Sequence, residues 1–182
     1  MKAKVISVFG SARPLKGSAD YECARRIGRL LAEAGFVVAT GGYMGTMEAI
    51  SEGAHEGKGH VIGVTSERIE TFRPIGPNPY VKQEIKYTTL RDRLLHLVQE
   101  NDGMIVLPGG IGTLAELAMA WNGMQTGEIE RRPLVLLGDI WRETLTTFFD
   151  EQYIAPEYFE LLHYAKTADE AVAFVINQLA GS

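Results

Sequence analysis

Several features that mark particular classes of protein are missing from this chain of 182 residues. Its one cysteine, Cys23, cannot form an internal disulfide, and its four histidines form no His-x-x-x-His pair, so a metal site has little support. No apolar run reaches membrane-spanning length, and residues 1–9 lack the long apolar region of a signal peptide. The net charge of −5 implies no basic face for nucleic acid. We therefore expect a cytoplasmic protein without a metal, and no contact with membrane or nucleic acid.

The chain reads as one domain, residues 1–182, because no internal repeat, low-complexity tract or linker divides it. Hydrophobic residues make up 46% of it, enough for a substantial core. Short apolar runs alternate with segments of helical periodicity, which predicts an α/β fold with a doubly wound parallel sheet and helices on both faces. Strands are expected at 4–9, 36–39, 60–64, 83–87, 104–107, 133–137 and 161–165, and helices at 18–34, 46–55, 89–98, 113–125, 139–153 and 168–179.

Residues 65–82 break this alternation. They contain Pro74, Pro77 and Pro79 with a glycine and an asparagine between them, so regular structure is not expected there. Loops of this length in compact domains are often lids or binding loops. This segment is therefore a candidate cover for a ligand.

A glycine-rich stretch, residues 108–113, lies between an expected strand and an expected helix. Without side chains at Gly109, Gly110 and Gly112, the backbone can bend sharply and an anion can approach the first helical N–H groups, so we interpret the stretch as a phosphate cradle. Thr113 and Glu116 fit a capping box with Thr113 at the N-cap, and Glu116 near a helix N-terminus is expected to stay ionised. A turn that merely needs glycine, with Glu116 acting only as a cap, is the alternative.

Two other loops are rich in small residues, one at Gly10 and one at 41–45, and each also follows an expected strand. Carboxyl ends of parallel strands share one edge of a sheet, where ligands bind, so the three loops should converge. Arg91 and Arg93 lie on opposite flanks of an apolar helical stripe, from which either could reach a ligand. A surface ion pair is the alternative for each arginine. The stripe consists of Leu90, Leu94, Leu97 and Val98.

A dehydrogenase is a second interpretation of the glycines. Gly110-x-Gly112-x-x-Ala115 matches the dinucleotide fingerprint, and Asp139 follows the next strand, where an acid that binds ribose is expected. A lone match of this kind is weak. The fingerprint usually opens the first strand–helix unit of its domain, whereas the loop at Gly10 lacks it.

Taken together, three motifs resemble those of the LOG ("Lonely guy") family, often labelled lysine decarboxylases. The resemblance extends from about residue 5 to residue 150 and implies a Rossmann-like fold, usually dimeric. Characterised members are cytokinin riboside 5′-monophosphate phosphoribohydrolases, which release a free base and ribose 5-phosphate from a small-molecule nucleoside monophosphate, with no cofactor needed. The motifs are Val8-Phe9-Gly10-Ser11, Gly41-Gly42-x-x-Gly45-x-Met47 and Pro108-Gly109-Gly110-x-Gly112-Thr113-x-x-Glu116.

The resemblance also implies roles for residues. The family's catalytic pair falls on Arg93, by counting back from Pro108, and on Glu116. An ionised Glu116 would stabilise positive charge on the ribose and orient a water molecule. Arg93 would bind phosphate or ribose oxygens, or hold Glu116 in place. The 5′-phosphate would be held by Gly10, Ser11, Gly41, Gly42, Gly45, Gly109, Gly110, Gly112 and Thr113.

The chain departs from the family pattern at three positions. Leu90 and Leu94 stand where a Met-x-x-Arg-Lys pattern has methionine and lysine, and Ala115 replaces a second glutamate. A related branch with the same glycine motifs comprises molybdenum cofactor carriers, which bind a phosphate-bearing pterin without hydrolysis. A non-catalytic carrier of a phosphate-bearing ligand is therefore the alternative to a hydrolase.

Overall fold

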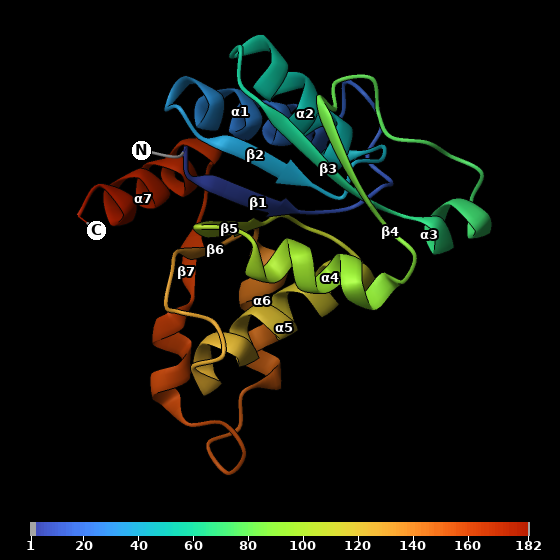
Figure 1. Ribbon diagram of the computed structural model, residues 1–182. Helices are drawn as coiled ribbons and strands as arrows, with labels where there is room; N and C mark the ends of the chain where they lie inside the picture. Colours follow the sequence, from blue (N-terminus) through green and yellow to red (C-terminus); the bar gives the residue numbers. More distant parts are fainter. Residues whose placement is uncertain (1–2, 182) are drawn as a thin grey trace.

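The computed structural model describes residues 3–181 and confirms the expected α/β architecture. A sheet of seven parallel strands, in the order β4-β3-β2-β1-β5-β6-β7, crosses the molecule between two layers of helices (Figure 1). The strands are β1 (Val5–Phe9), β2 (Val37–Thr40), β3 (Val61–Ser66), β4 (Gln83–Tyr87), β5 (Gly103–Val106), β6 (Leu134–Leu137) and β7 (His163–Ala165). The helices are α1 (Ala19–Glu33), α2 (Thr46–Glu56), α3 (Glu67–Phe72), α4 (Leu90–Gln99), α5 (Ile111–Thr126), α6 (Asp139–Phe148), the 3-10 helix η1 (Pro156–Leu161) and α7 (Ala168–Ala180).

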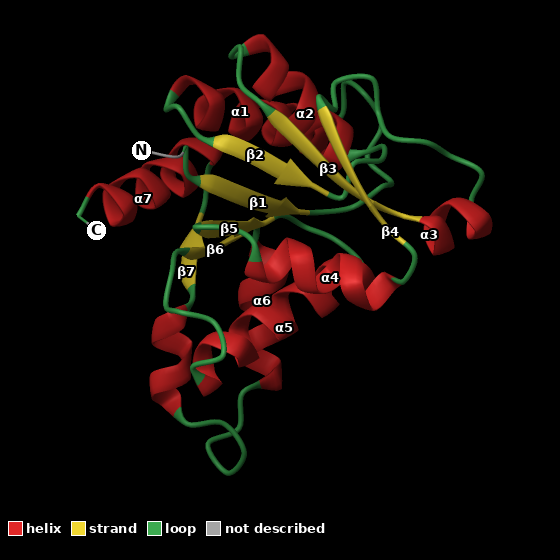
Figure 2. Cartoon of the chain, in the orientation of Figure 1, coloured by secondary structure: helices red, strands yellow, loops and turns green. Residues whose placement is uncertain are grey.

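The core has two halves, one on each face of the sheet. Figure 2 shows α1, α2 and α7 on one face and α4, α5 and α6 on the other. Because side chains alternate along a strand, Ile6 and Ile105 are buried with the first group of helices, whereas Phe9 and Val106 are buried with the second. Both faces are therefore apolar, which accounts for the nearly continuous apolar runs of the central strands.

Local signals in the sequence set several helix ends. The Ser18 side chain accepts a hydrogen bond from the Tyr21 N–H and caps α1, and Thr89 caps α4 in the same way through the Asp92 N–H. Gly35 follows α1 with φ of +86°, a conformation that favours glycine and ends the helix. The expected helix starts at 18 and 89 are thus confirmed.

Some expectations about individual elements were wrong. Residues 65–82 do contain regular structure, because β3 extends to Ser66 and α3 follows it, capped by the Ser66 side chain. Helix α6 ends at Phe148 rather than at 153, since Phe149 adopts an extended conformation. Leu90, expected in the core stripe of α4, is 53% exposed because it is the first residue of the helix, and of the expected stripe only Leu97 and Val98 are buried.

The strand order brings the three glycine-containing loops to one place. Strands β2, β1 and β5 are neighbours in the sheet, and the chain leaves β1 toward β2 on one side and later returns to β5 on the other. The crevice at such a reversal, outside the carboxyl ends of the strands, is the usual ligand site of a doubly wound sheet.

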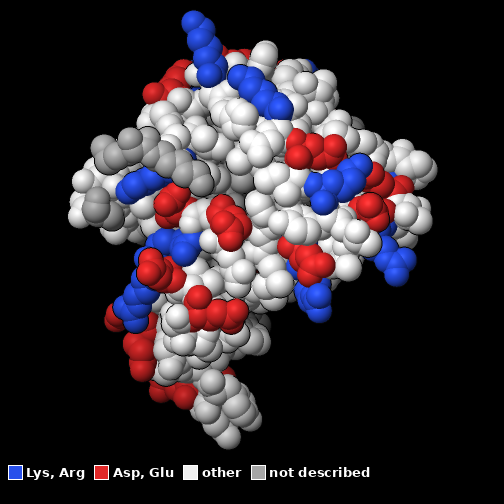
Figure 3. Space-filling view, in the orientation of Figure 1, with Lys and Arg blue, Asp and Glu red and all other residues white. Residues whose placement is uncertain are grey.

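The described surface gives two further facts. On the face shown in Figure 3, acidic and basic side chains are interspersed rather than gathered by sign. Among residues 3–181, no helix combines the length and apolarity that a membrane crossing requires.

Candidate active site

A cavity of about 320 Å³ opens at the carboxyl ends of β1 and β5, and its size falls in the range of small-molecule sites. Its lining comes partly from the loop after β1, the start of α5 and Arg93 of α4. The rest of the lining comes from Tyr43, Met47 and side chains of the segment 69–75. The sequence-predicted residues in its lining are Gly10, Ser11, Arg93, Gly110, Gly112, Thr113 and Glu116.

The remaining predicted glycines, Gly41, Gly42, Gly45 and Gly109, lie beside the cavity but not in its lining. A side chain on Gly41 would overlap the Arg93 guanidinium, whose Nη2 donates to the Gly41 carbonyl at 3.3 Å. A side chain on Gly45, where φ is +68°, would overlap the backbone of the loop after β1. Gly41 therefore leaves room for the buried Arg93, and Gly45 allows the loop after β1 to pack closely against the turn before α2.

Arg93 is buried, with 9% of its surface exposed, and backbone carbonyls hold it in place. Its Nε donates to the Val64 carbonyl at 2.8 Å, in addition to the bond to Gly41. The third nitrogen, Nη1, lies 3.7 Å from Oε1 of Glu116. Arg91 by contrast is exposed and pairs with Asp92 at 3.1 Å, so the surface ion pair is correct for Arg91 and wrong for Arg93.

Glu116 is also buried, with 7% exposed, and lines the cavity. Among residues 3–181, its carboxylate accepts no hydrogen bond, and its cationic neighbour is Arg93. Loss of water around the carboxylate raises the pKa of Glu116 to about 7, although the positive charge of Arg93 opposes this rise. The expectation that Glu116 simply stays ionised is therefore wrong, because desolvation outweighs the helix N-terminus and the arginine.

The capping box is also absent. Helix α5 begins at Ile111, with Gly110 at the N-cap, so Thr113 lies inside the first turn and Glu116 in the second. The Thr113 hydroxyl instead donates to the Gly10 carbonyl at 3.1 Å and ties α5 to the loop after β1. The first N–H groups of α5 have no partner within the helix and remain available to an anion in the cavity.

Some lining residues were not among the predicted site residues. Arg13 adds a positive charge to the lining, and Ile69, Phe72 and Ile75 form an apolar wall, with Arg73 between them. Only the general signal of a long loop at 65–82 pointed to this wall.

Asp139, the acid of the dehydrogenase interpretation, starts α6 and does not line the cavity. No cluster of three His, Cys, Asp or Glu side chains suited to a metal ion occurs in the described part of the chain.

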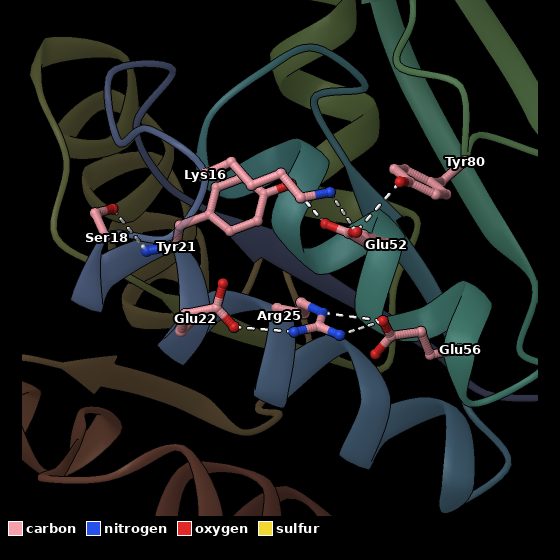
Figure 4. A network of polar contacts seen from close by, with 8 residues as sticks. All are labelled: Lys16, Ser18, Tyr21, Glu22, Arg25, Glu52, Glu56 and Tyr80. Carbon is pink, nitrogen blue, oxygen red and sulfur yellow. Dashed lines mark hydrogen bonds and ion pairs between the residues drawn. The ribbon is translucent and has the colours of Figure 1, made fainter.

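A buried carboxylate behind the cavity connects the segments that surround it. Glu52 of α2 accepts hydrogen bonds from Lys16 at 2.6 Å, Tyr21 at 2.7 Å and Tyr80 at 3.2 Å (Figure 4). Burial opposes ionisation, but these donors lower the pKa of Glu52 overall. Because Lys16 follows the loop after β1 and Tyr80 follows residues 69–75, Glu52 anchors both walls of the cavity.

We expect Glu52→Ala to lower the free energy of unfolding by about 2 kcal/mol, since the buried Tyr21 hydroxyl then loses its acceptor. Urea denaturation measures this change. Glu56→Ala is the matched control: Glu56 lies one turn further along α2 and pairs with Arg25 at the surface (Figure 4), which predicts a loss of less than about 1 kcal/mol. Equal losses in both variants would contradict the anchoring role.

This chain is similar to known proteins in sequence and in fold. A family model described as "Possible lysine decarboxylase" matches residues 47–175. A cytokinin riboside 5′-monophosphate phosphoribohydrolase of Arabidopsis thaliana is 32% identical over 176 residues, covering 93% of this chain and 79% of the relative. One from Mycobacterium tuberculosis is 28% identical, and the match covers 92% of this chain and 90% of the relative. Among solved structures, the molybdenum cofactor carrier protein of Chlamydomonas reinhardtii has a TM-score of 0.74 at 25% identity, covering 98% and 99%.

Proposed function

Because this chain belongs to the LOG family, whose model is the one described as possible lysine decarboxylase, we propose that it is a nucleoside 5′-monophosphate phosphoribohydrolase. Such an enzyme cleaves the N-glycosidic bond and releases a free base and ribose 5-phosphate. The observation that carries the proposal is the position of Glu116. This buried carboxylate accepts no hydrogen bond from the described residues, faces Arg93 and lies one helical turn from the start of α5.

The 5′-phosphate is proposed to bind at the start of α5. There the N–H groups around Gly112 and Thr113 and the positive end of the helix dipole favour an anion. Ser11 and Arg13 approach the same region from the loop after β1 and add a hydroxyl and a positive charge. The glycines behind the cavity keep these groups close together, as described above for Gly45.

Glu116 is proposed to act on the ribose. Breaking the bond between C1′ and the base nitrogen sends the bonding electrons to the base and leaves positive charge on the sugar ring, which an ionised carboxylate stabilises. Glu116 also accepts a proton from the water that forms the new C1′–O bond, and this proton then passes to the departing base, which returns Glu116 to its ionised form. Arg93 opposes the rise in the pKa of Glu116, so that it favours the ionised form, and it lies beside the carboxylate, from where it can approach ribose oxygens.

Incubation with AMP and with other nucleoside monophosphates, followed by chromatography, tests the proposal. Release of free base together with ribose 5-phosphate is the expected result. Nucleosides that lack the 5′-phosphate are the control and should be cleaved far more slowly, because they leave the start of α5 empty. If no monophosphate in such a panel releases its base, the hydrolase proposal fails.

A non-catalytic carrier of a phosphate-bearing ligand is the second candidate, favoured by the similarity to the Chlamydomonas carrier over almost the whole of both chains. The carrier predicts tight binding of a phosphate-bearing pterin with no bond cleaved, whereas the hydrolase predicts turnover of a nucleoside monophosphate. Calorimetry with the pterin beside the chromatographic assay separates the two candidates.

We also propose that the protein works as a homodimer in the cytoplasm. Between α5 and α6 lies an apolar groove of about 490 Å³ whose lining includes Leu114, Ala118, Trp121 and Phe148. Phe148 is 64% exposed and Leu114 is 38% exposed, and a second copy of the chain would cover them. Helix α5 carries residues of both the groove and the cavity.

Ala118→Glu should therefore give a monomer, because it places a charge in the centre of the proposed interface. Light scattering coupled to size-exclusion chromatography measures the mass. The control is Ala173→Glu, an exposed alanine on α7 that lies outside the groove, and it should leave the dimer intact. A wild-type protein with the mass of one chain would overturn the proposed dimer.

A further inference from the structure

We propose that residues 67–77 form a lid and that Phe72 in this lid packs against the base of a bound nucleotide, so that the lid closes on ligands that carry an aromatic base. The inference rests on the proposed function, because it takes the ligand to be a nucleoside monophosphate. It goes beyond the proposed function by assigning recognition of the base to Phe72.

Both ends of the segment are held by the same turn. At its start, the Tyr43 hydroxyl accepts a hydrogen bond from the Ser66 N–H at 2.8 Å and donates to the Ser66 carbonyl at 3.2 Å. At its end, the buried Asn78 binds the Gly42 carbonyl through its N–H at 2.8 Å and the Tyr43 carbonyl through its Nδ2 at 2.9 Å. Both ends of the segment are thus fixed to the turn at Gly42 and Tyr43.

Between these ends the segment is held weakly. None of residues 67–77 is buried, and in Figure 1 helix α3 projects beyond the end of the sheet. Glu70 of α3 pairs with Lys86 of β4 at 2.9 Å, and because this pair is only partly buried its contribution to stability is modest. Fixed ends with a weakly held middle permit the segment to move as a unit while the rest of the site stays in place.

The inner side of the segment is apolar and faces the cavity. Ile69, Phe72 and Ile75 line it, although Phe72 is 79% exposed. The Arg73 guanidinium lies 5.6 Å from the centre of the Phe72 ring. A large aromatic side chain that is exposed beside a cavity has apolar surface that a ligand can cover.

Because the phosphate and the ribose already have proposed sites in the cavity, we assign the apolar wall of Ile69, Phe72 and Ile75 to the base. The phosphate site at the start of α5 and the ribose site at Glu116 and Arg93 use polar groups of the lining, whereas the segment contributes three apolar side chains, with Arg73 among them. Every nucleobase has a planar face that stacks on aromatic rings, so Phe72 would bury its ring on closure.

Calorimetry tests the lid in the Glu116→Gln background, where we expect turnover of bound AMP to be about a thousandfold slower. We expect Phe72→Ala to weaken AMP binding about tenfold. Binding of ribose 5-phosphate, which has no base, should change less than about twofold, and Phe72→Tyr should restore AMP binding because it keeps the ring. Tyr153→Ala, which removes an exposed aromatic ring outside both the cavity and the apolar groove, is the control and should change neither ligand's affinity. Hydrogen exchange in residues 67–77 should slow with AMP and not with ribose 5-phosphate.

Equal weakening of AMP and ribose 5-phosphate in Phe72→Ala, or no weakening of either, overturns the lid, as does a protein that does not bind AMP. Failure of the hydrolase proposal looks different. If AMP binds with this dependence on Phe72 but protein with Glu116 intact releases no base from any monophosphate, the lid stands and the hydrolase does not.

Discussion

Glu116→Gln should lower kcat for hydrolysis of the N-glycosidic bond by about a thousandfold while leaving the Kd for the nucleoside monophosphate within a few-fold. Glutamine has nearly the shape of glutamate but can neither carry the negative charge that stabilises the ribose cation nor accept the proton of the attacking water. Because Glu116 accepts no hydrogen bond from residues 3–181, the substitution removes none, and the fold should be retained. Steady-state kinetics and calorimetry separate the two effects.

Glu143→Gln is a suitable control, since Glu143 is an exposed residue of α6 and outside the cavity. It should retain the wild-type kcat. A Glu116→Gln enzyme that keeps more than about a tenth of the wild-type kcat would show that another group stabilises the transition state. Loss of substrate binding with little loss of kcat would instead make Glu116 a binding residue.

The raised pKa of Glu116 predicts a pH dependence with a definite sign. Since the ionised form is the active one, kcat/KM should rise as the pH increases toward about 7 and level off above it. The folded state takes up a proton on Glu116 more readily than the unfolded state, so ionisation above pH 4.5 destabilises the fold. Glu116→Gln should therefore gain stability relative to wild type as the pH rises from 4.5 through 7, which chemical denaturation at several pH values measures.

The sheet and the meeting of its loops could be predicted from the sequence because both depend on local patterns. Apolar runs such as residues 104–107 indicated buried strands, and the glycines after them indicated strand-to-helix turns. The parallel arrangement then required the loops after β1, β2 and β5 to share an edge. The order of strands and loops in the sequence was therefore enough to predict that the loops meet, because this prediction does not depend on side-chain packing.

The environment of individual site residues could not be predicted, because it depends on contacts between distant segments. Arg93 is buried because the carbonyls of Val64 and Gly41, far away in sequence, accept its hydrogen bonds. The pKa of Glu116 follows from that same burial. A local signal for α3 did exist: the prolines of 65–82 all follow Phe72, so they argue against helix only in the second half of that segment.

Arg93→Met should reduce kcat/KM at pH 7 by about a hundredfold and move the rising limb of the pH profile to higher pH. Without the positive charge 3.7 Å away, only desolvation acts on Glu116, and its pKa rises further. Part of the activity should therefore return at higher pH. Because the Val64 and Gly41 carbonyls lose their donor, the free energy of unfolding should also fall by about 3 kcal/mol.

Arg93→Lys separates the charge from the geometry. A lysine keeps a positive charge near Glu116 but cannot reproduce the fork that bonds two carbonyls and faces a carboxylate at once. In Arg93→Lys, the rising limb of the kcat/KM profile should stay near the pH at which it lies in wild type. The kcat should fall, because Glu116 is held less precisely. If Arg93→Met raised KM and left the pH limb where it is in wild type, Arg93 would act on the substrate phosphate rather than on Glu116. The shift of the limb, more than the loss of activity, therefore decides what the arginine does.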